Sequence, residues 1–495
     1  MTKDRSFWSA LKWAYTMNWG QNGFSALFTF VLAGILGPRD FGLVAMAMIY
    51  IAFIRMFLEQ GMVAAVVQRK DLRPDHLDSV FWFNNVLAAA LMGLSLLLAG
   101  WWAGVNRTPE LALVISVLSI DLPLEGLAIV QRAFMQKEMD FKSLSLRSNL
   151  SVLTGGVVGV VMAFRGFGVW SLVGQRLTQD IVALSLLWSL SHWRPGWRFS
   201  RRALREILQF SSATFVGGVG TFAHNQADAL LIGMFFGPVA VGLYRLAQRL
   251  VLLLVDVGTS SLQLVSLSEF SRFQDKPAEL RRSVLTCIRL SATITLPAMA
   301  GLAMASDLVM RVIGSQWALA AGPLRILCLL GMALGFIMFT GPLLTALSKP
   351  LFMSLVTWAA TITNVGALVC VSLFLREAPI SRQVTGIALA RFGVGALLML
   401  PVYVFLLMRH SGVSAREILN AVSPALLSAG LVGGVARLLS TSPLGLRPIP
   451  ALIVVGGTAG SIGLAAVISL DAQFRRYALD LYARLFRGGE AAIDA

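Results

Sequence analysis

The sequence predicts an all-α integral membrane protein with about 14 transmembrane helices, and its composition and apolar pattern support this. Of the 495 residues, 57% are hydrophobic and 13% are charged, whereas a soluble domain carries about 25% charged residues. Apolar stretches of roughly 20 residues, the length that a helix needs to cross a bilayer, recur along the whole chain. Irregular backbone does not face lipid, so we interpret these stretches as helices and exclude a water-soluble fold.

The expected helices follow one another with short connections. The first 12 residues are basic, and the apolar run behind them is too long for a signal sequence, so we expect a retained first span. A break at Arg165-Gly166 divides the region 143–190 into two spans. The expected spans, read from the apolar pattern, lie at roughly 12–36, 41–67, 79–104, 109–131, 143–164, 167–190, 209–236, 239–267, 284–305, 319–346, 351–374, 383–408, 418–438 and 449–469.

The basic residues are distributed unevenly among the connections. The chain has a net charge of +16. With the N-terminus placed in the cytoplasm, about 26 Lys and Arg residues fall in cytoplasmic connections and about eight in outer ones, as the positive-inside rule requires. Both termini are therefore expected to be cytoplasmic. Nucleic-acid binding is the other use of a basic chain, but charge confined to short loops between spans does not favour it, so we expect no nucleic-acid partner.

Two matching segments lie 200 positions apart. Gly37–Leu43 reads GPRDFGL and Gly237–Leu243 reads GPVAVGL, and each follows one long apolar run and opens another. Two like halves that each begin with a membrane hairpin are typical of transporters built from repeats, whose substrate path lies between the repeats. The first spans of both halves are polar in their middles, so we expect spans 1, 2, 7 and 8 to surround a water-filled cleft.

Ionisable residues inside the spans are the candidates for function, because a charge at membrane depth costs several kcal/mol unless it meets water or a partner. Arg245 and Arg249 lie one helical turn apart, and an anionic substrate would relieve their repulsion. Asp121 and Glu125 share a face in the same way, and a proton, a cation or those arginines would compensate them. The full set is Arg55, Arg176, Arg245, Arg249, Arg289, Arg325, Arg391, Glu59, Asp121, Glu125, Asp180, Asp228 and Asp256.

Structural interpretations stay open beside the functional ones. Arg55 and Glu59 are one turn apart and suit a structural ion pair as well as a cavity role. Arg176, Arg289 and Arg325 lie near expected span ends, where an arginine reaches the interface with its long side chain. The glycine pairs at four-residue spacing are interpreted as helix-packing positions.

Motifs of water-soluble chemistry are missing from the sequence. It contains no GxxxxGK[ST] phosphate loop and no HExxH metal motif. Cys287, Cys328 and Cys370 all fall inside expected spans without a CxxC neighbour, which argues against a disulfide framework or a metal site. We therefore expect no catalytic residues, no metal and no cofactor.

Several motifs between about residues 30 and 260 resemble one family. They are VQRKDL at Val67–Leu72 with VFWFN at Val80–Asn84, Gln131-Arg132 with FKSL at Phe141–Leu144, GFGVWSLV at Gly166–Val173, and DALLIG at Asp228–Gly233 running into GLYRLA at Gly242–Ala247. The sequence resembles the polysaccharide-transporter branch of the multidrug/oligosaccharidyl-lipid/polysaccharide exporter superfamily. Within that branch it is most similar to the lipopolysaccharide and exopolysaccharide biosynthesis flippases, the WzxC-like group.

The resemblance implies two six-helix lobes related by a pseudo-twofold axis, with two further C-terminal helices. It also implies a flippase of the bacterial inner membrane that carries undecaprenyl-diphosphate-linked oligosaccharides from the inner to the outer leaflet by alternating access. The expected divisions are an N-terminal lobe at 1–190, an amphipathic linker at 191–208, a C-terminal lobe at 209–408, extra spans at 409–470 and an amphipathic basic tail at 471–495. Linker and tail suit either membrane anchoring or recruitment of a partner.

Candidate site residues follow from depth and pairing together with that substrate. We expect the diphosphate to meet arginines, which bind phosphate oxygens bidentately. The expected partners besides the lipid-linked saccharide are membrane lipids and the polysaccharide assembly machinery, and the expected coupling ion is H⁺ or Na⁺. The candidates are Arg55, Arg245 and Arg249 for diphosphate, Gln21, Asn22, Asn225 and Gln226 for sugar, and Asp121, Glu125 and Asp228 for ion coupling.

Two other functions compete with this interpretation. A drug or metabolite exporter of the same superfamily would favour cavity carboxylates over arginines for an amphipathic cation. A membrane-embedded polysaccharide polymerase or ligase would be expected to carry a large outer loop with catalytic Arg or His, whereas every outer connection expected here is short.

Overall fold

The computed structural model describes residues 2–59, 62–63, 66, 69, 71, 73–441 and 448–470. Helices make up this part of the chain and it contains no strand, which confirms the expected all-α class. Ten helical segments within it are long and apolar enough to cross a membrane, with a shorter apolar helix at Ile449–Gly463. One of the ten, Gly218–Asp256, covers parts of two expected spans. The count of 14 and the cytoplasmic termini stay predictions.

Contacts divide the chain into two compact units. The N-terminal unit comprises Met1–Arg245 and Leu368–Gln383, and the C-terminal unit comprises Leu246–Ala367 and Val384–Ala495. The border therefore passes through a helix that follows the second Gly-Pro turn. The expected tail at 471–495 lies outside the described residues.

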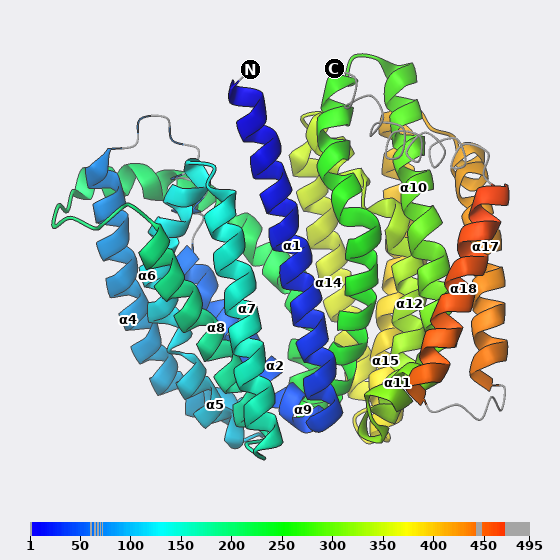
Figure 1. Cartoon of the computed structure of the whole chain (residues 1–495), viewed down its shortest axis with the longest axis horizontal. Helices are drawn as coiled ribbons and strands as arrows, with labels where there is room; N and C mark the ends of the chain where they lie inside the picture. The colour runs from blue at the N-terminus through cyan, green and yellow to red at the C-terminus, as the bar shows by residue number, and fades with distance from the viewer. Residues whose placement is uncertain are drawn as a thin grey trace, which may run out of the picture. The chain divides into compact units, whose positions relative to one another are not determined.

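The N-terminal unit is a bundle of apolar helices. In it α1 packs against α7, α7 against α8, and α6 against both α4 and α8 (Figure 1). Helix α7 ends at Phe164 and α8 begins at Val169, with positive φ at Gly166 (+82°) and Gly168 (+55°), so the expected break at Arg165-Gly166 is confirmed. Its helices are α1 (Thr2–Ile35), α2 (Pro38–Glu59), α4 (Pro74–Val105), α5 (Glu110–Leu118), α6 (Asp121–Lys137), α7 (Phe141–Phe164), α8 (Val169–Leu190) and the first part of α9 (Arg201–Arg272).

The C-terminal unit is centred on α10 (Pro277–Met304), which packs against α12 and α17, and α17 packs against α18 (Figure 1). Its core is aliphatic and aromatic around Ile288, Leu296 and Phe339. The helices α17 and α18 coincide with the last two expected spans. The other helices are α11 (Ser306–Ile313), a 3₁₀ turn at Ser315–Ala320, α12 (Ala321–Ile337), α13 (Thr340–Ala346), α14 (Pro350–Phe374), α15 (Ile380–Phe392), a π-helical segment at Gly393–Met399, α16 (Leu400–Ser411), α17 (Ala415–Thr441) and α18 (Pro448–Leu470).

The two Gly-Pro turns meet inside the N-terminal unit. Pro38 opens α2, while Gly237 interrupts α9 with a φ of +81° directly before Pro238. A Cβ on Gly42 would lie 1.7 Å from the Pro238 carbonyl oxygen, and a Cβ on Gly242 would lie 1.9 Å from the Pro38 carbonyl oxygen. The repeated sequence therefore forms a reciprocal backbone contact that leaves no room for a side chain at the sixth position of either motif.

The linker is tied to the start of α4. The Gly196 N–H donates to Asp78 Oδ1 at 2.9 Å, and the Trp82 indole N–H donates to the Gly196 carbonyl at 2.8 Å. The Trp197 ring stacks on Trp82 with 4.7 Å between centroids, and its other face is exposed. Pinning of this kind holds the amphipathic linker against the N-terminal unit.

A charged contact completes the docking of the linker. Glu206, in the first turns of α9, pairs with Arg69 and lies 3.3 Å from His76 Nε2. Hydrogen bonds from these two groups lower the pKa of the Glu206 carboxyl to about 2. Glu206 is therefore ionised throughout the physiological range.

Candidate functional site

Arg55 is the centre of a charged network inside the N-terminal unit. From α2 its guanidinium contacts Glu125 Oε2 at 2.9 Å, Glu59 Oε1 at 3.0 Å and Asp121 Oδ2 at 3.6 Å. Asp121 and Glu125 share one face of α6, being four residues apart, and that face packs toward α2 and α8. Both carboxylates are buried, with 3% and 8% of their side-chain surfaces exposed.

Two further arginines complete this network. Arg132, two turns after Glu125 on α6, contacts the second oxygen of that carboxylate. Arg176 of α8 lies 3.3 Å from Asp121 Oδ1 and 2.8 Å from Asp180 Oδ2. Each buried carboxylate of α6 is thus held between two arginines. The carboxylates are compensated within this unit, so neither Arg245 nor Arg249 is needed for that purpose.

A polar cavity of about 290 Å³ lies beside this network, and we call it the N-terminal cavity. It is formed by α1, α6, α7 and α8. Its charged lining is three arginines and one carboxylate, and its neutral polar lining is glutamine and serine. Such a lining is unusual in a bundle of membrane helices, because polar groups there need water or a partner. The polar lining residues are Gln21, Arg132, Gln136, Arg147, Ser148, Ser151, Arg176, Gln179 and Asp180.

Arg147 differs from the other arginines of the cavity. Its Nε–H donates to the Ala183 carbonyl at 3.1 Å, and it forms no ion pair with any described residue. A guanidinium has five N–H donors, so most of the hydrogen-bonding capacity of Arg147 is left for the cavity. Arg132 and Arg176 also line the cavity, but each is already paired with carboxylates.

Arg132 and Arg147 are among the basic residues that we counted in the cytoplasmic connections, and the structure shows both within helices. Helix α6 continues to Lys137 and α7 begins at Phe141, so both arginines lie inside helices. A signal for Arg132 was present, since it follows Glu125 by seven residues and so lies on the same helix face. Nothing local in the sequence marks Arg147.

The remaining candidates of the N-terminal unit form two groups. Gln21 lines the N-terminal cavity and accepts a hydrogen bond from the Ser148 hydroxyl at 2.9 Å. Asn22, next to it on α1, is exposed like Gln21 but is not among the residues that line this cavity. In α9, Arg245 donates to Gln226 and the Tyr244 hydroxyl donates to Asp228 at 3.0 Å.

Asn225 is exposed. Arg249 belongs to the C-terminal unit, beyond the border. The expected cleft between the halves, with Arg245 and Arg249 around it, stays a prediction.

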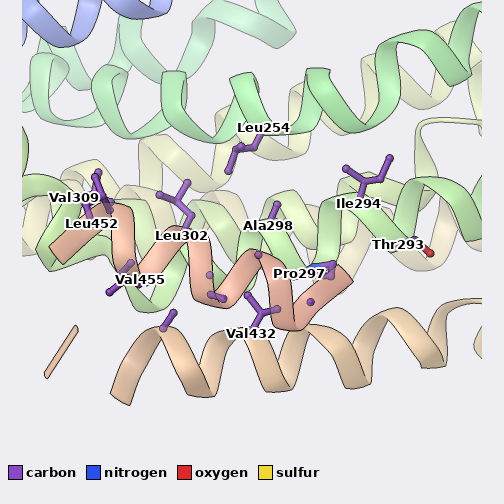
Figure 2. Close-up of a pocket in the computed structure, with 17 residues that line it drawn as sticks. Leu254, Thr293, Ile294, Pro297, Ala298, Leu302, Val309, Val432, Leu452 and Val455 are labelled. Carbon is purple, nitrogen blue, oxygen red and sulfur yellow. The ribbon is translucent and has the colours of Figure 1, made fainter. Parts of the chain in front are cut away.

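The C-terminal unit contains a cavity of the opposite character, which we call the C-terminal groove. It has a volume of about 500 Å³ and is walled by α10, α11, α17, α18 and Leu254 of α9. Among the described residues that line it, Thr293 carries the only polar side chain (Figure 2). Alanine and glycine of α18 form much of one wall, among them Gly456, Ala459 and Gly460, and their small size makes the space.

Comparison with known proteins identifies the family. Residues 31–321, more than half of the chain, match the family described as "Polysaccharide biosynthesis protein". The chain belongs to this family, and the resemblance stated from its motifs is confirmed.

Curated relatives in bacteria agree with this. The succinoglycan biosynthesis transport protein ExoT of Rhizobium meliloti (strain 1021) is 28% identical over 319 residues, covering 64% of this chain and 64% of the relative. The lipopolysaccharide biosynthesis protein WzxC of Escherichia coli (strain K12) is 25% identical over 305 residues, covering 61% of this chain and 62% of the relative. The chain thus matches less than two thirds of the length of each.

Solved structures share the fold. The lipid II flippase MurJ superposes with a TM-score of 0.73 at 14% identity, covering 95% of this chain and all of that one. An inward-facing multidrug resistance transporter of the MATE family gives a TM-score of 0.58 at 16% identity, covering 79% and 95%. These likenesses place the chain in a fold used by membrane transporters, and they carry no information on its substrate.

Proposed function

We propose that this protein is a flippase of the bacterial inner membrane that moves undecaprenyl-diphosphate-linked oligosaccharide units from the inner to the outer leaflet for lipopolysaccharide or exopolysaccharide assembly. Membership of the polysaccharide biosynthesis family supports the pathway. The observation that carries the proposal is the pairing of a cationic polar cavity in one unit with a long apolar groove in the other. A substrate with a charged, hydroxylated head and a hydrocarbon tail needs both.

The head of such a substrate cannot cross hydrocarbon unaided, because buried charges and unpaired hydroxyl groups each cost several kcal/mol. Guanidinium groups replace water around phosphate, and glutamine and serine side chains hydrogen-bond sugar hydroxyls. In the N-terminal cavity, the guanidinium groups belong to Arg132, Arg147 and Arg176. The side chains that can hydrogen-bond sugar include Gln21 and Ser148.

The polyprenyl tail needs an apolar path of its own. The C-terminal groove offers about 500 Å³ with an almost wholly hydrocarbon lining, so a hydrocarbon tail that leaves the lipid for it meets no unpaired charge. We assign the groove to the tail on this chemistry.

Alternating access coupled to an H⁺ or Na⁺ gradient is part of the proposal. Asp121, Glu125 and Asp228 are the candidates for the coupling ion, and Asp228 is buried and accepts a hydrogen bond from Tyr244. If it carries the coupling ion, Asp228→Asn should flatten the dependence of transport on pH or sodium. An unchanged dependence would remove Asp228 from the coupling site.

The proposed function is tested by removing the protein from the bacterium that makes it. Lipid-linked oligosaccharide should then accumulate in the inner leaflet, and the surface polysaccharide should disappear, with both reversed by the intact gene. An exporter of drugs would instead leave the polysaccharide unchanged and raise drug sensitivity, and that result would overturn the proposal in favour of the competing function.

A further inference from the structure

Resting on the proposed function, we propose that the N-terminal cavity is a phosphate-binding subsite for the head of the lipid-linked substrate, with Arg147 as the residue that binds it. This assignment differs from the expected diphosphate site at Arg55, Arg245 and Arg249. It follows from which arginines already have carboxylate partners and which one does not.

The ion pairs argue against Arg55 as the phosphate ligand. Its guanidinium contacts three carboxylates, so an incoming phosphate would have to displace Glu59, Asp121 or Glu125. Displacement would leave a buried carboxylate with one arginine fewer, which is strongly unfavourable in a low-dielectric interior. Arg55 therefore suits a structural role that fixes α2 against α6.

Arg147 has the opposite situation. It has no carboxylate partner among the described residues, and it faces a cavity whose wall also carries Arg132 and Arg176. A lone cation in a membrane bundle is costly unless an anion or water accompanies it. A phosphate group in the cavity would meet Arg147 directly and the two paired arginines at the side, with one opposing charge from Asp180.

The size and the position of the cavity fit a phosphate group better than a whole saccharide. About 290 Å³ lies at the low end of small-molecule pockets. Arg132 lies five residues before the end of α6 at Lys137, and Arg147 lies six residues after the start of α7 at Phe141. At 1.5 Å per residue, both are roughly 8–9 Å along the helix axis from those ends. The charge pattern predicts that this connection is cytoplasmic, the side from which the substrate enters.

Binding to the full-length protein in lipid nanodiscs tests the assignment. The probes are farnesyl diphosphate as a short polyprenyl diphosphate, inorganic pyrophosphate as the free anion, and phosphatidylglycerol as an ordinary anionic lipid. Charge-assisted hydrogen bonds are worth about 1.5–3 kcal/mol, so Arg147→Gln should weaken binding of farnesyl diphosphate by roughly 10- to 100-fold. Arg147→Lys should restore part of it.

Two more variants show whether a loss of binding in Arg147→Gln comes from the lost guanidinium or from misfolding. Asp180→Asn removes the opposing charge and should tighten binding of farnesyl diphosphate. Arg165→Gln changes an exposed arginine at the far end of α7 and should leave binding unchanged. Equal binding of farnesyl diphosphate to the wild type and to Arg147→Gln would overturn the proposal. Displacement of farnesyl diphosphate by an equal concentration of phosphatidylglycerol would also overturn it.

The outcome separates this inference from the proposed function. If the wild type transports lipid-linked saccharide but Arg147→Gln transports it equally well, the subsite is wrong and the function stands. If the wild type does not transport it at all, the proposed function fails.

Discussion

The two units of this protein differ in what they bury: charged side chains in the N-terminal unit and almost only apolar side chains around the groove of the C-terminal unit. The N-terminal unit buries arginines and carboxylates beside a polar cavity, and its buried α6 carboxylates each lie between two arginines. The C-terminal unit surrounds a larger groove with aliphatic side chains and a single threonine hydroxyl. The difference in lining is what leads the proposed function to assign the charged head of the substrate to one unit and its hydrocarbon tail to the other.

The largest expected effect comes from breaking the network of the N-terminal unit. Glu125→Ala leaves Arg55 and Arg132 without their shared buried carboxylate, which should destabilise the protein by about 3–5 kcal/mol. Thermal unfolding of the purified protein measures this.

The matched control is Glu110→Ala. Its pair with Arg39 is exposed, with 61% of the arginine side chain and 56% of the glutamate side chain accessible, and should contribute less than about 1 kcal/mol. Equal losses for the two variants would show that the buried network is not a stabilising feature.

The second effect concerns space rather than charge. Gly42→Ala forces a methyl group into the Pro238 carbonyl, and overpacking of this kind costs about 1–3 kcal/mol. Gly37→Ala is the control, because its added methyl group meets nothing within 4 Å and Gly37 has no positive φ. Comparable unfolding temperatures for both variants would contradict the tight contact between the turns.

A third change fills the C-terminal groove. A Cβ on Gly456 meets nothing within 4 Å, so Gly456→Leu should fold and occupy the groove. The leucine side chain then occupies space that a bound tail would fill, and the tail loses packing contacts there. Transport of a long-chain substrate should fall accordingly.

The control for Gly456→Leu is Gly430→Leu on α17. Gly430 also has open space around it but does not line the groove. Equal transport by Gly456→Leu and the wild type would argue that the tail does not use the groove.

The smallest effect is at the linker. The pKa of Glu206 is lowered to about 2 from 4.5. Its contribution to docking of the linker is therefore fully present above pH 4.5 and is lost as the pH falls through about 2. Glu206→Gln should remove this acid transition while Arg69, Arg202 and His76 still face the site, as measured by fluorescence of the Trp82–Trp197 pair. A transition that persists in the variant would assign it to another group.

The sequence was sufficient for the helical class, the break at Arg165-Gly166 and the family. The sequence also marked the two Gly-Pro turns. The contact between them depends on tertiary packing, which the local sequence pattern does not predict. For the site, helix periodicity paired Asp121 with Glu125, because four-residue spacing is local. The arginines that compensate these carboxylates come from α2 and α8 as well as from α6, and such long-range pairing could not be predicted from spacing.

The account is tested most directly by transport in proteoliposomes. The measurement is the rate at which a fluorescent polyprenyl-diphosphate saccharide reaches the opposite leaflet, with short and long tails, for the wild type, Arg147→Gln and Gly456→Leu. We predict that the wild type exceeds empty vesicles, that Arg147→Gln is slow with both tails, and that Gly456→Leu is slow mainly with the long one. A wild type no faster than empty vesicles, or variants that do not separate head from tail, would contradict the division of labour between the two units.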